Sequence, residues 1–361
     1  MSGYRTESCM IVHPDEIEQQ WLDLQDRADC SWFQSWGWVG TWLEQIAAEF
    51  HPLVVKVWSD NRIVGMGIFL PRHVRRRLLV RSNALFLNEY PFDGRNMVIE
   101  YNGLLADGEH MQAVYRETIA YLLRENHHID ELFFSAIADR EPLAGIRYKI
   151  LEESFTWSVR LEGHEKGIDA YLATLSKNRR GQVRRSLRLY EKQGPLQLEE
   201  AVDLHQAFEF LDGLKVLHTV RWQSKGKGGS FANPRWEAFH RALIQARFPR
   251  GEIQLLKVSL PDGVIGYLYN FIWRKRVYVL QTGFSASTDK RLMPGYVVHV
   301  MAIAHNRDKG MSVYDLMHGD SLYKQILCSR QEKLQWIVVQ RNRLKFCLED
   351  LAVKLVRALR H

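Results

Sequence analysis

The stretch LVVKVWSDNRIVGMGIFLP, residues Leu53–Pro71, decides the fold class of this chain because it occurs a second time. Its counterpart is IQLLKVSLPDGVIGYLYNFI, residues Ile253–Ile272. Each stretch is two apolar runs around a polar turn, the pattern of a β-hairpin. Two matched positions share one offset: Lys56 with Lys257 (257 − 56 = 201), and Gly65 with Gly266 (266 − 65 = 201). A repeat of this length predicts two copies of one domain and excludes a short-period solenoid.

The segments that follow the two hairpins extend the repeat. YNGLLADG (Tyr101–Gly108) and QTGFSAST (Gln281–Thr288) each precede a helix pattern and then a strand pattern. This order predicts an α/β fold in which a mixed sheet (α+β mixed sheet) is flanked by helices. We expect one domain over residues 1–160, a second over 161–340, and an amphipathic C-terminal helix over 341–361.

Composition limits the class of protein. The chain has 361 residues, 46% of them hydrophobic and 25% charged, which supplies a core for two globular domains. The four cysteines stand far apart without metal-ligand spacing, so we expect a reduced protein and no metal. The N-terminus has no apolar signal core and the longest apolar runs have the length of strands. These features predict a soluble, cytoplasmic protein.

The positive charge of the chain is concentrated in SKNRRGQVRRSLRLYEKQG, residues Ser176–Gly194, which has seven Lys or Arg residues and one Glu. As a helix, this stretch places Arg180, Arg184 and Arg188 in one stripe beside an apolar face. Such a stripe can hold an anionic donor or acceptor through guanidinium forks. A solvated helix face and an RNA-binding face are the alternatives.

The two helices after the hairpins begin differently. In the second copy, four residues combine positive charge with a Pro-Gly helix start and predict a pyrophosphate site: Lys290, Arg291, Pro294 and Gly295. In the first copy, Asp107 and Glu109 stand at that place and repel phosphate. An ordinary helix start is the alternative for the second copy.

Four stretches in order carry a family resemblance: LSKNRRGQVRRSLRLYEKQG, LHTVRWQSKGKGGSFA, YVLQTGFSASTDKRLMPGYVV and YDLMHGDSLYK. They resemble the CelD/BcsL-type branch of the GNAT acyltransferase superfamily, which is related to the FemAB aminoacyltransferases. The resemblance covers roughly Tyr4–Trp336 and is strongest over Leu175–Lys324. It implies two tandem GNAT-like acyl-CoA N-acyltransferase domains, with acetyl-CoA or another acyl-CoA held by the second. The family's Gly-rich loop is replaced here by KRLMPGY, which leaves the identity of the donor open.

Acyl transfer of this type needs a polarised carbonyl, a base and an acid for the leaving group. In RVYVLQTGF, Gly283 is expected to mark a bulge or a splay of the strand, with Tyr278 and Gln281 facing the cleft. In LHTVRWQSK, His218 is a candidate base, and Arg221 and Trp222 are candidate substrate contacts. Ordinary strand positions and a packed helix histidine are the alternatives.

The stretch YDLMHGDSLYKQ offers a second set of candidates. Asp315 ends a strand, and Asp320, Tyr323 and Lys324 fall within one turn of a short helix. We expect Tyr323 to protonate the leaving thiolate, Asp320 to orient the acceptor or act as base, and Asp315 and Lys324 to contact the substrate. Alternatively, Asp320 is an N-cap and Lys324 a surface residue.

The leading hypothesis is an acyl-CoA-dependent acyltransferase that acts on an amino or hydroxyl group of a sugar, polysaccharide or cell-envelope precursor. The resemblance adds cellulose or exopolysaccharide production as its setting. Aminoacyl transfer from tRNA is the second hypothesis, and a non-catalytic nucleic-acid or lipid-surface binder is the third. The leucines of RNRLKFCLEDLAVKLVRALRH form a stripe that can touch anionic lipid, cap the sheet or make a dimer contact.

Overall fold

The computed structural model divides the chain into two compact units. Unit 1 is Met1–Glu153 with Leu334–His361, and unit 2 is Ser154–Lys333. The structure describes residues 3–76, 80–89, 91–92, 95–96, 99–138, 143–163, 166–287, 289, 291–319 and 321–358. The boundaries expected at 160 and 340 are the last residues of two strands, β9 (Lys149–Arg160) and β15 (Arg330–Gln340), and the division falls inside both strands.

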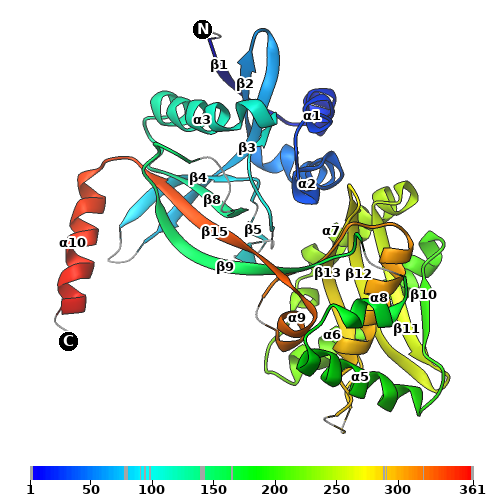
Figure 1. Ribbon diagram of the computed structural model, residues 1–361. Helices are drawn as coiled ribbons and strands as arrows, with labels where there is room; N and C mark the ends of the chain where they lie inside the picture. Colours follow the sequence, from blue (N-terminus) through cyan, green and yellow to red (C-terminus); the bar gives the residue numbers. More distant parts are fainter. Residues whose placement is uncertain are drawn as a thin grey trace. The chain divides into compact units, whose positions relative to one another are not determined.

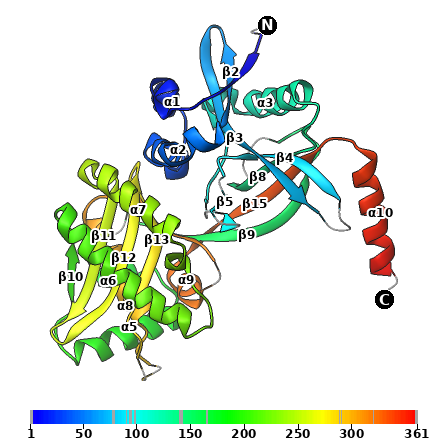
Figure 2. The same cartoon turned by 180° about the vertical axis from the view of Figure 1, so that it is seen from behind.

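Unit 1 is a sheet in the order β1-β2-β3-β4-β8-β15, in which β4 and β8 run parallel and the other neighbours antiparallel. Figures 1 and 2 show the hairpin of β2 and β3 between α3 and the pair α1 and α2. Its elements are β1 (Arg5–Met10), α1 (Glu18–Gln25), α2 (Trp36–Phe50), β2 (Leu53–Ser59), β3 (Arg62–Arg75), β4 (Arg81–Leu87), β5 (Pro91–Phe92), β6 (Arg95–Asn96), β7 (Leu105–Ala106), α3 (Met111–Glu125), β8 (Glu131–Ala138) and α10 (Leu344–Ala358).

Unit 2 is a sheet in the order β9-β14-β13-β12-β11-β10, in which β13 and β14 run parallel and the other neighbours antiparallel. Its elements are α4 (Ile168–Ala173), α5 (Lys177–Glu191), β10 (Gln197–Glu200), α6 (Leu204–Gln223), α7 (Pro234–Arg247), β11 (Ile253–Leu260), β12 (Gly263–Trp273), β13 (Arg276–Phe284), α8 (Pro294–Asp308), β14 (Val313–His318) and α9 (Leu322–Leu327). The predicted α/β mixed sheet with flanking helices is confirmed.

The repeat extends to the register of the two hairpins. In unit 1, Val57 pairs with Gly65 and a bulge follows before the next pair. In unit 2, Val258 pairs with Gly266 and the same bulge follows. Both pairs keep the offset of 201 residues. The sequence repeat is therefore also a structural repeat, and it includes the position of the β-bulge.

The repeated glycines bring a helix close to each sheet. A Cβ atom at Gly65 would lie 2.3 Å from Cγ1 of Val114 in α3. A Cβ atom at Gly266 would lie 3.1 Å from Cγ2 of Val298 in α8 and closer still to the neighbouring strand. Neither position has room for a side chain, so the close helix–sheet approach depends on glycine.

The closing strand of each sheet comes from the other half of the chain. Strand β9 follows β8 in sequence, yet its part in unit 2 pairs with β14, as in Arg160 with Val313. Strand β15 follows β14, yet its part in unit 1 pairs with β8, from Leu334 with Ala138 to Gln340 with Glu131. Each unit therefore has the same six-strand order, with the sixth strands exchanged.

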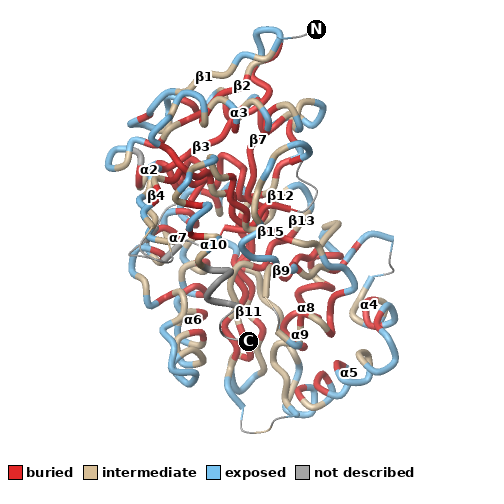
Figure 3. Tube along the Cα trace, turned by 90° about the vertical axis from the view of Figure 1, so that its left-hand side faces the viewer, coloured by how far each residue is buried: buried red, intermediate tan, exposed pale blue. Residues whose placement is uncertain are grey.

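In unit 2, helices cover both faces of the sheet. Neighbouring residues of a strand point to opposite faces: Gly283 of β13 meets Leu214 of α6, and Phe284 meets the ring of His299 in α8. Helix α5 packs its buried face against α8, through residues such as Val183. Figure 3 shows α8 buried over most of its length, whereas α5 is largely exposed. The layers on the two faces are therefore α6 on one and α8 with α5 on the other.

Candidate active site

A pocket of about 540 Å³ lies in unit 2 where β13 ends and the helix layers from the two faces of the sheet approach each other. Four segments supply its walls, namely the end of α6, the end of β13 with the residues after it, the start of α8, and the start of α9. The lining residues are Leu217, Val220, Arg221, Ser224, Lys225, Phe284, Ser285, Ala286, Met293, Pro294, Gly295, Tyr296, Ser321, Leu322 and Tyr323. Three residues expected at the helix start or in α9, Pro294, Gly295 and Tyr323, therefore meet in one hollow, together with Arg221.

Most of the pocket wall is apolar, with a few polar groups placed in it. The guanidinium carbon of Arg221 lies 5.7 Å from the centre of the Phe284 ring, a cation–π contact. The ring of Phe284 meets that of Tyr323 edge to face, with 6.1 Å between centroids. Such a wall accommodates an uncharged chain or acyl group, while Arg221 and the hydroxyl of Tyr323 offer hydrogen-bond donors.

Packing fixes the position of the Tyr323 ring. His299 of α8 stacks on it at 4.9 Å and 15°, and Nδ1 of His299 lies 3.0 Å from the hydroxyl of Tyr314. Burial raises the pKa of Tyr323, so the phenol stays protonated at neutral pH. The site therefore contains a neutral O–H donor with a fixed ring, which is the property that an acid for a leaving group requires.

The start of α8 is fixed from the side of α5. The hydroxyl of Ser186 accepts a hydrogen bond from the backbone N–H of Met293 at 3.1 Å. Pro294 is the first residue of the helix, and a Cβ atom at Gly295 would lie 3.7 Å from the Tyr323 ring. The missing side chain at Gly295 therefore leaves room in the pocket.

The predicted basic residues before α8 are placed outside this pocket or are not described. Arg291 is exposed and forms an ion pair with Asp289 at 2.7 Å, and this hydrogen-bonded contact lowers the pKa of Asp289 to about 2. Lys290 lies outside the described residues. The pairing partly neutralises the charge that the pyrophosphate hypothesis assigned to this loop.

His218 is a packed helix histidine. Its side chain is buried against the rings of Trp222 and Phe231, and Gly229 packs closely on both His218 and Trp222. Burial, helped by the charge of Arg221, lowers the pKa of His218 to about 4. Neither His218 nor Trp222 lines the pocket, although both lie within one helical turn of Arg221.

The residues predicted on β13 and β14 lie mainly inside the fold. Gln281 donates a hydrogen bond to the hydroxyl of Ser230 at 3.0 Å. Tyr278 is buried beneath the guanidinium of Arg276, which forms an ion pair with the fully buried Asp315 at 2.6 Å. These three candidates therefore contact other residues of unit 2 and not the pocket.

The bulge expected at Gly283 is found elsewhere in β13. Gly283 pairs regularly with Tyr267, whereas the register shifts between the pairs made by Gln281 and Val279. A Cβ atom at Gly283 would lie 2.7 Å from the carbonyl oxygen of Leu214 in α6. The register shift therefore lies next to Gln281, and Gly283 itself provides close packing against α6.

The turn before α9 is held by Lys324. This buried side chain donates hydrogen bonds to the carbonyl oxygens of Met317 and His318, and Gly319 follows with φ of 122°, which favours glycine. Lys324 therefore organises the turn and does not line the pocket. Asp320 lies outside the described residues.

The basic stripe of α5 lies beside the face that packs on α8. Arg184 forms an exposed ion pair with Asp169 at 3.0 Å, and Arg180 reaches the carbonyl oxygen of Ala173 at 3.5 Å. A separate surface hollow of about 470 Å³ is lined by Gly181, Arg184, Arg185, Arg188, Leu189 and Lys192. Arg184 and Arg188 thus share one hollow, which Arg180 does not line, and none of the three lines the pocket at α8.

Sequence reasoning missed the apolar wall of the pocket and the residues that position it. Phe284 and Met293 carry no charge or catalytic group, and Ser186 and His299 act through packing and single hydrogen bonds. One signal was present: Phe284 lies next to Gly283 at the end of a strand, where a ligand pocket of an α/β sheet is expected.

The comparisons with known proteins can now be set beside this geometry. Residues 177–325, which contain α5, the pocket and Tyr323, match the family described as Acetyltransferase (GNAT) domain. The fold is of the GNAT type. No curated protein matches the chain.

Solved structures resemble this chain over nearly its whole length. FemX is 12% identical, with a TM-score of 0.59 over 95% of this chain and 99% of that one. L-PGS from Bacillus licheniformis is 10% identical, with a TM-score of 0.56 over 97% of this chain and 99% of that one. The C-terminal domain of a provisionally assigned lysylphosphatidylglycerol synthetase from Agrobacterium fabrum is 14% identical, with a TM-score of 0.53 over 96% of each chain. At these identities the likeness concerns the fold.

The described residues show neither a metal-binding cluster nor a membrane-spanning helix. Within them, no group of three or more His, Cys, Asp or Glu side chains is arranged to hold a metal ion. No helix in this part of the chain has the length and apolar character needed to cross a bilayer.

Proposed function

We propose that unit 2 is an acyltransferase that binds an activated acyl donor in the pocket at the start of α8. The observation that carries this proposal is the neutral phenol of Tyr323, whose ring is held by packing in the wall of an apolar pocket of the GNAT-matched segment. The acyl group lies along the wall of Phe284, and Arg221 faces the anionic part of the donor.

In the proposed reaction, an acceptor nitrogen or oxygen attacks the acyl carbon. The bond from that carbon to the leaving group breaks, and the leaving atom takes the proton of the Tyr323 hydroxyl. The proton of the acceptor passes to water, which later restores Tyr323. The acceptor is an amino or hydroxyl group of a sugar, polysaccharide or cell-envelope precursor, as the CelD/BcsL resemblance implies.

An acyl-CoA is the first candidate donor, because its uncharged acyl arm suits the apolar wall and its phosphates suit Arg221 and Lys225. The test supplies acetyl-CoA with amino sugars and nucleotide sugars and follows release of the free thiol. Isothermal titration with acetyl-CoA and with CoA measures binding separately. Thiol release that requires an acceptor supports the proposal, whereas the absence of both binding and turnover with CoA compounds excludes this donor.

An aminoacyl-tRNA is the second candidate donor, favoured by the basic hollow on α5. The resemblance in fold to a provisionally assigned lysylphosphatidylglycerol synthetase agrees with aminoacyl transfer. If this donor is correct, charged tRNA binds and Arg188→Gln weakens the binding about ten- to a hundredfold, the loss of one charged hydrogen bond. If the Arg188→Gln variant binds charged tRNA as tightly as wild type does, the hollow on α5 is not part of the donor site.

A further inference from the structure

Helix α10 is fastened to unit 1 by one of its faces. Phe346 and Glu349 on that face are each 4% exposed. The guanidinium of Arg76 in unit 1 forms an ion pair with Glu349 at 2.7 Å and lies 5.4 Å from the centre of the Phe346 ring. The orientation of the helix about its own axis is therefore fixed by both polar and apolar contacts.

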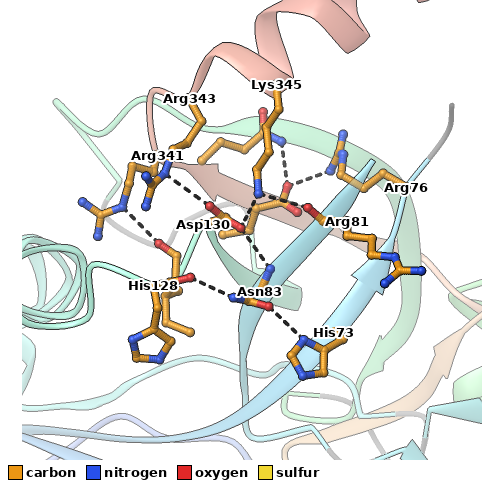
Figure 4. A network of polar contacts seen from close by, with 12 residues as sticks. His73, Arg76, Arg81, Asn83, His128, Asp130, Arg341, Arg343 and Lys345 are labelled. Carbon is orange, nitrogen blue, oxygen red and sulfur yellow. Dashed lines mark hydrogen bonds and ion pairs between the residues drawn. The ribbon is translucent and has the colours of Figure 1, made fainter. Parts of the chain in front are cut away.

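The first turn of α10 is held by a network of polar contacts (Figure 4). Lys345 donates to Oδ2 of Asp130 at 2.6 Å and to the carbonyl oxygen of Arg81 at 3.0 Å. Arg343 lies 3.3 Å from Asp130, and Arg341 donates to the carbonyl oxygen of Ile129 at 3.0 Å. This network joins α10 to the ends of β4 and β8.

The opposite face of α10 is an exposed leucine stripe, which we define as Leu344, Leu348 and Leu351. Their exposed fractions are 78%, 58% and 56%, although leucine is a residue that folding normally buries. Their spacing of four and three residues puts them on one side of the helix, and Leu355 continues the spacing in the sequence. A helix held on one face thus presents a row of leucines on the other.

Two arginines lie on the strands near the start of α10. The two acidic residues of the helix are paired, Glu349 with Arg76 and Asp350 with Lys149 at 2.6 Å. Arg75 and Arg81 are exposed and lie opposite each other across β3 and β4, next to the carbonyl group that Lys345 contacts. Two like charges in one cross-strand pair are unfavourable unless an anion lies between them.

We propose that the leucine stripe and the arginine pair Arg75 and Arg81 dock unit 1 on the surface of an anionic phospholipid bilayer. The leucines enter the boundary between headgroups and acyl chains, and the arginines bind headgroup phosphates. A second copy of this chain is a poorer partner, because a contact through the same patch would bring its arginine pair against another arginine pair. This proposal concerns unit 1 and does not depend on the donor used by unit 2.

The test measures co-sedimentation of the full chain with vesicles of phosphatidylcholine, with and without phosphatidylglycerol. We expect binding to the anionic vesicles that weakens in high salt. The variant Leu348→Glu/Leu351→Glu should bind about tenfold more weakly or worse, since two apolar anchors are lost. Its melting temperature should be unchanged, since both side chains are exposed.

A matched control replaces an exposed apolar residue elsewhere. Val216 of α6 is 61% exposed and does not line the pocket, so Val216→Glu should bind the vesicles as wild type does. Arg75→Gln/Arg81→Gln should remove the preference for phosphatidylglycerol. Wild type that stays in the supernatant, or a leucine variant that sediments equally, overturns the proposal. If wild type is a dimer in sedimentation velocity and the leucine variant is a monomer, the leucine stripe is instead a self-association surface.

Discussion

At the scale of single residues, Tyr323 combines a fixed ring with a raised pKa. The neutral phenol is the form that donates a proton, and it is lost only as the pH rises through a pKa above the ordinary tyrosine value of 10. Tyr323→Phe keeps the stacking on His299 and removes the proton. We expect a fall in kcat of about a hundredfold or more with little change in donor affinity.

The pH profile separates this role from a structural one. Wild type should lose activity on an alkaline limb above pH 10, and Tyr323→Phe should lack that limb. Equal kcat for the variant and wild type, in an assay whose chemical step is rate-limiting, would show that Tyr323 is not the acid.

Gly295 provides a second test, in which a substitution should weaken donor binding without lowering the melting temperature. An added methyl group would lie 3.5 Å from Phe284 and 3.7 Å from Tyr323, ordinary contact distances, so Gly295→Ala folds without a clash. Alanine also favours a helix by up to about 1 kcal/mol. We expect an unchanged or slightly higher melting temperature and donor affinity about tenfold weaker, because the methyl group occupies the pocket. A melting curve and a donor titration on the same sample check both expectations.

Sequence reasoning found part of the pocket at this scale. Pro294, Gly295 and Tyr323 were recognisable because their residue types have a chemical or conformational meaning. Trp222 was predicted together with Arg221, but only Arg221 lines the pocket. One step along a helix turns the side chain through about 100°, and only packing tells which neighbour faces the pocket. Asp315 was predicted as a substrate contact because it is a carboxylate at the end of a strand. Only the structure shows that Asp315 forms an ion pair with Arg276.

At the scale of elements, the exchange of closing strands predicts which unit a core substitution destabilises. If each closing strand belonged to the half of the chain in which it is encoded, the opposite result would be expected. Ile337 of β15 is fully buried in the core of unit 1, and Val159 of β9 is 4% exposed in the core of unit 2. Ile337→Ala should destabilise unit 1 by about 2–5 kcal/mol, and Val159→Ala should destabilise unit 2 by a smaller amount. Hydrogen exchange read separately for peptides of each unit identifies which core weakens. Protection lost in unit 2 by Ile337→Ala would contradict the exchange.

The hairpins and the closing strands differed in how well the sequence predicted them. The hairpins were predictable because a polar turn joins two runs that pair locally, and the repeat marks both copies. The runs that become β9 and β15 also alternate as strands, but their partners lie far away in sequence. An alternating pattern says which face a strand buries and nothing about the neighbour with which it pairs.

At the scale of the whole molecule, three buried histidines make the stability of unit 2 dependent on pH. Burial lowers the pKa of His218 to about 4 and those of His240 and His299 to about 3. The unfolded chain binds these protons near pH 6.5 and the folded unit does not. The free energy of unfolding should therefore fall as the pH drops from about 6.5 toward 4, by up to about 4 kcal/mol per pH unit for three such groups.

Calorimetry across that range checks this expectation, because the transition of unit 2 should move to lower temperature on acidification. His240→Leu removes one titrating group and should flatten the slope by about a third, whatever it does to stability at neutral pH. A slope that is the same in this variant would assign the acid sensitivity to carboxylates.

The exchanged strands also set the order in which the two units can be completed during synthesis, and this order is the reverse of the order of the two halves in the chain. The ribosome makes most of unit 1 first, but β8 lacks its second neighbour, β15, until Leu334–Gln340 emerges, after every residue of unit 2. Unit 2 has β9 from its beginning and can close as soon as β14 is released. The nascent chain therefore carries an open strand edge on its older half, the kind of edge that invites aggregation and chaperone binding. The half that is translated second becomes native first.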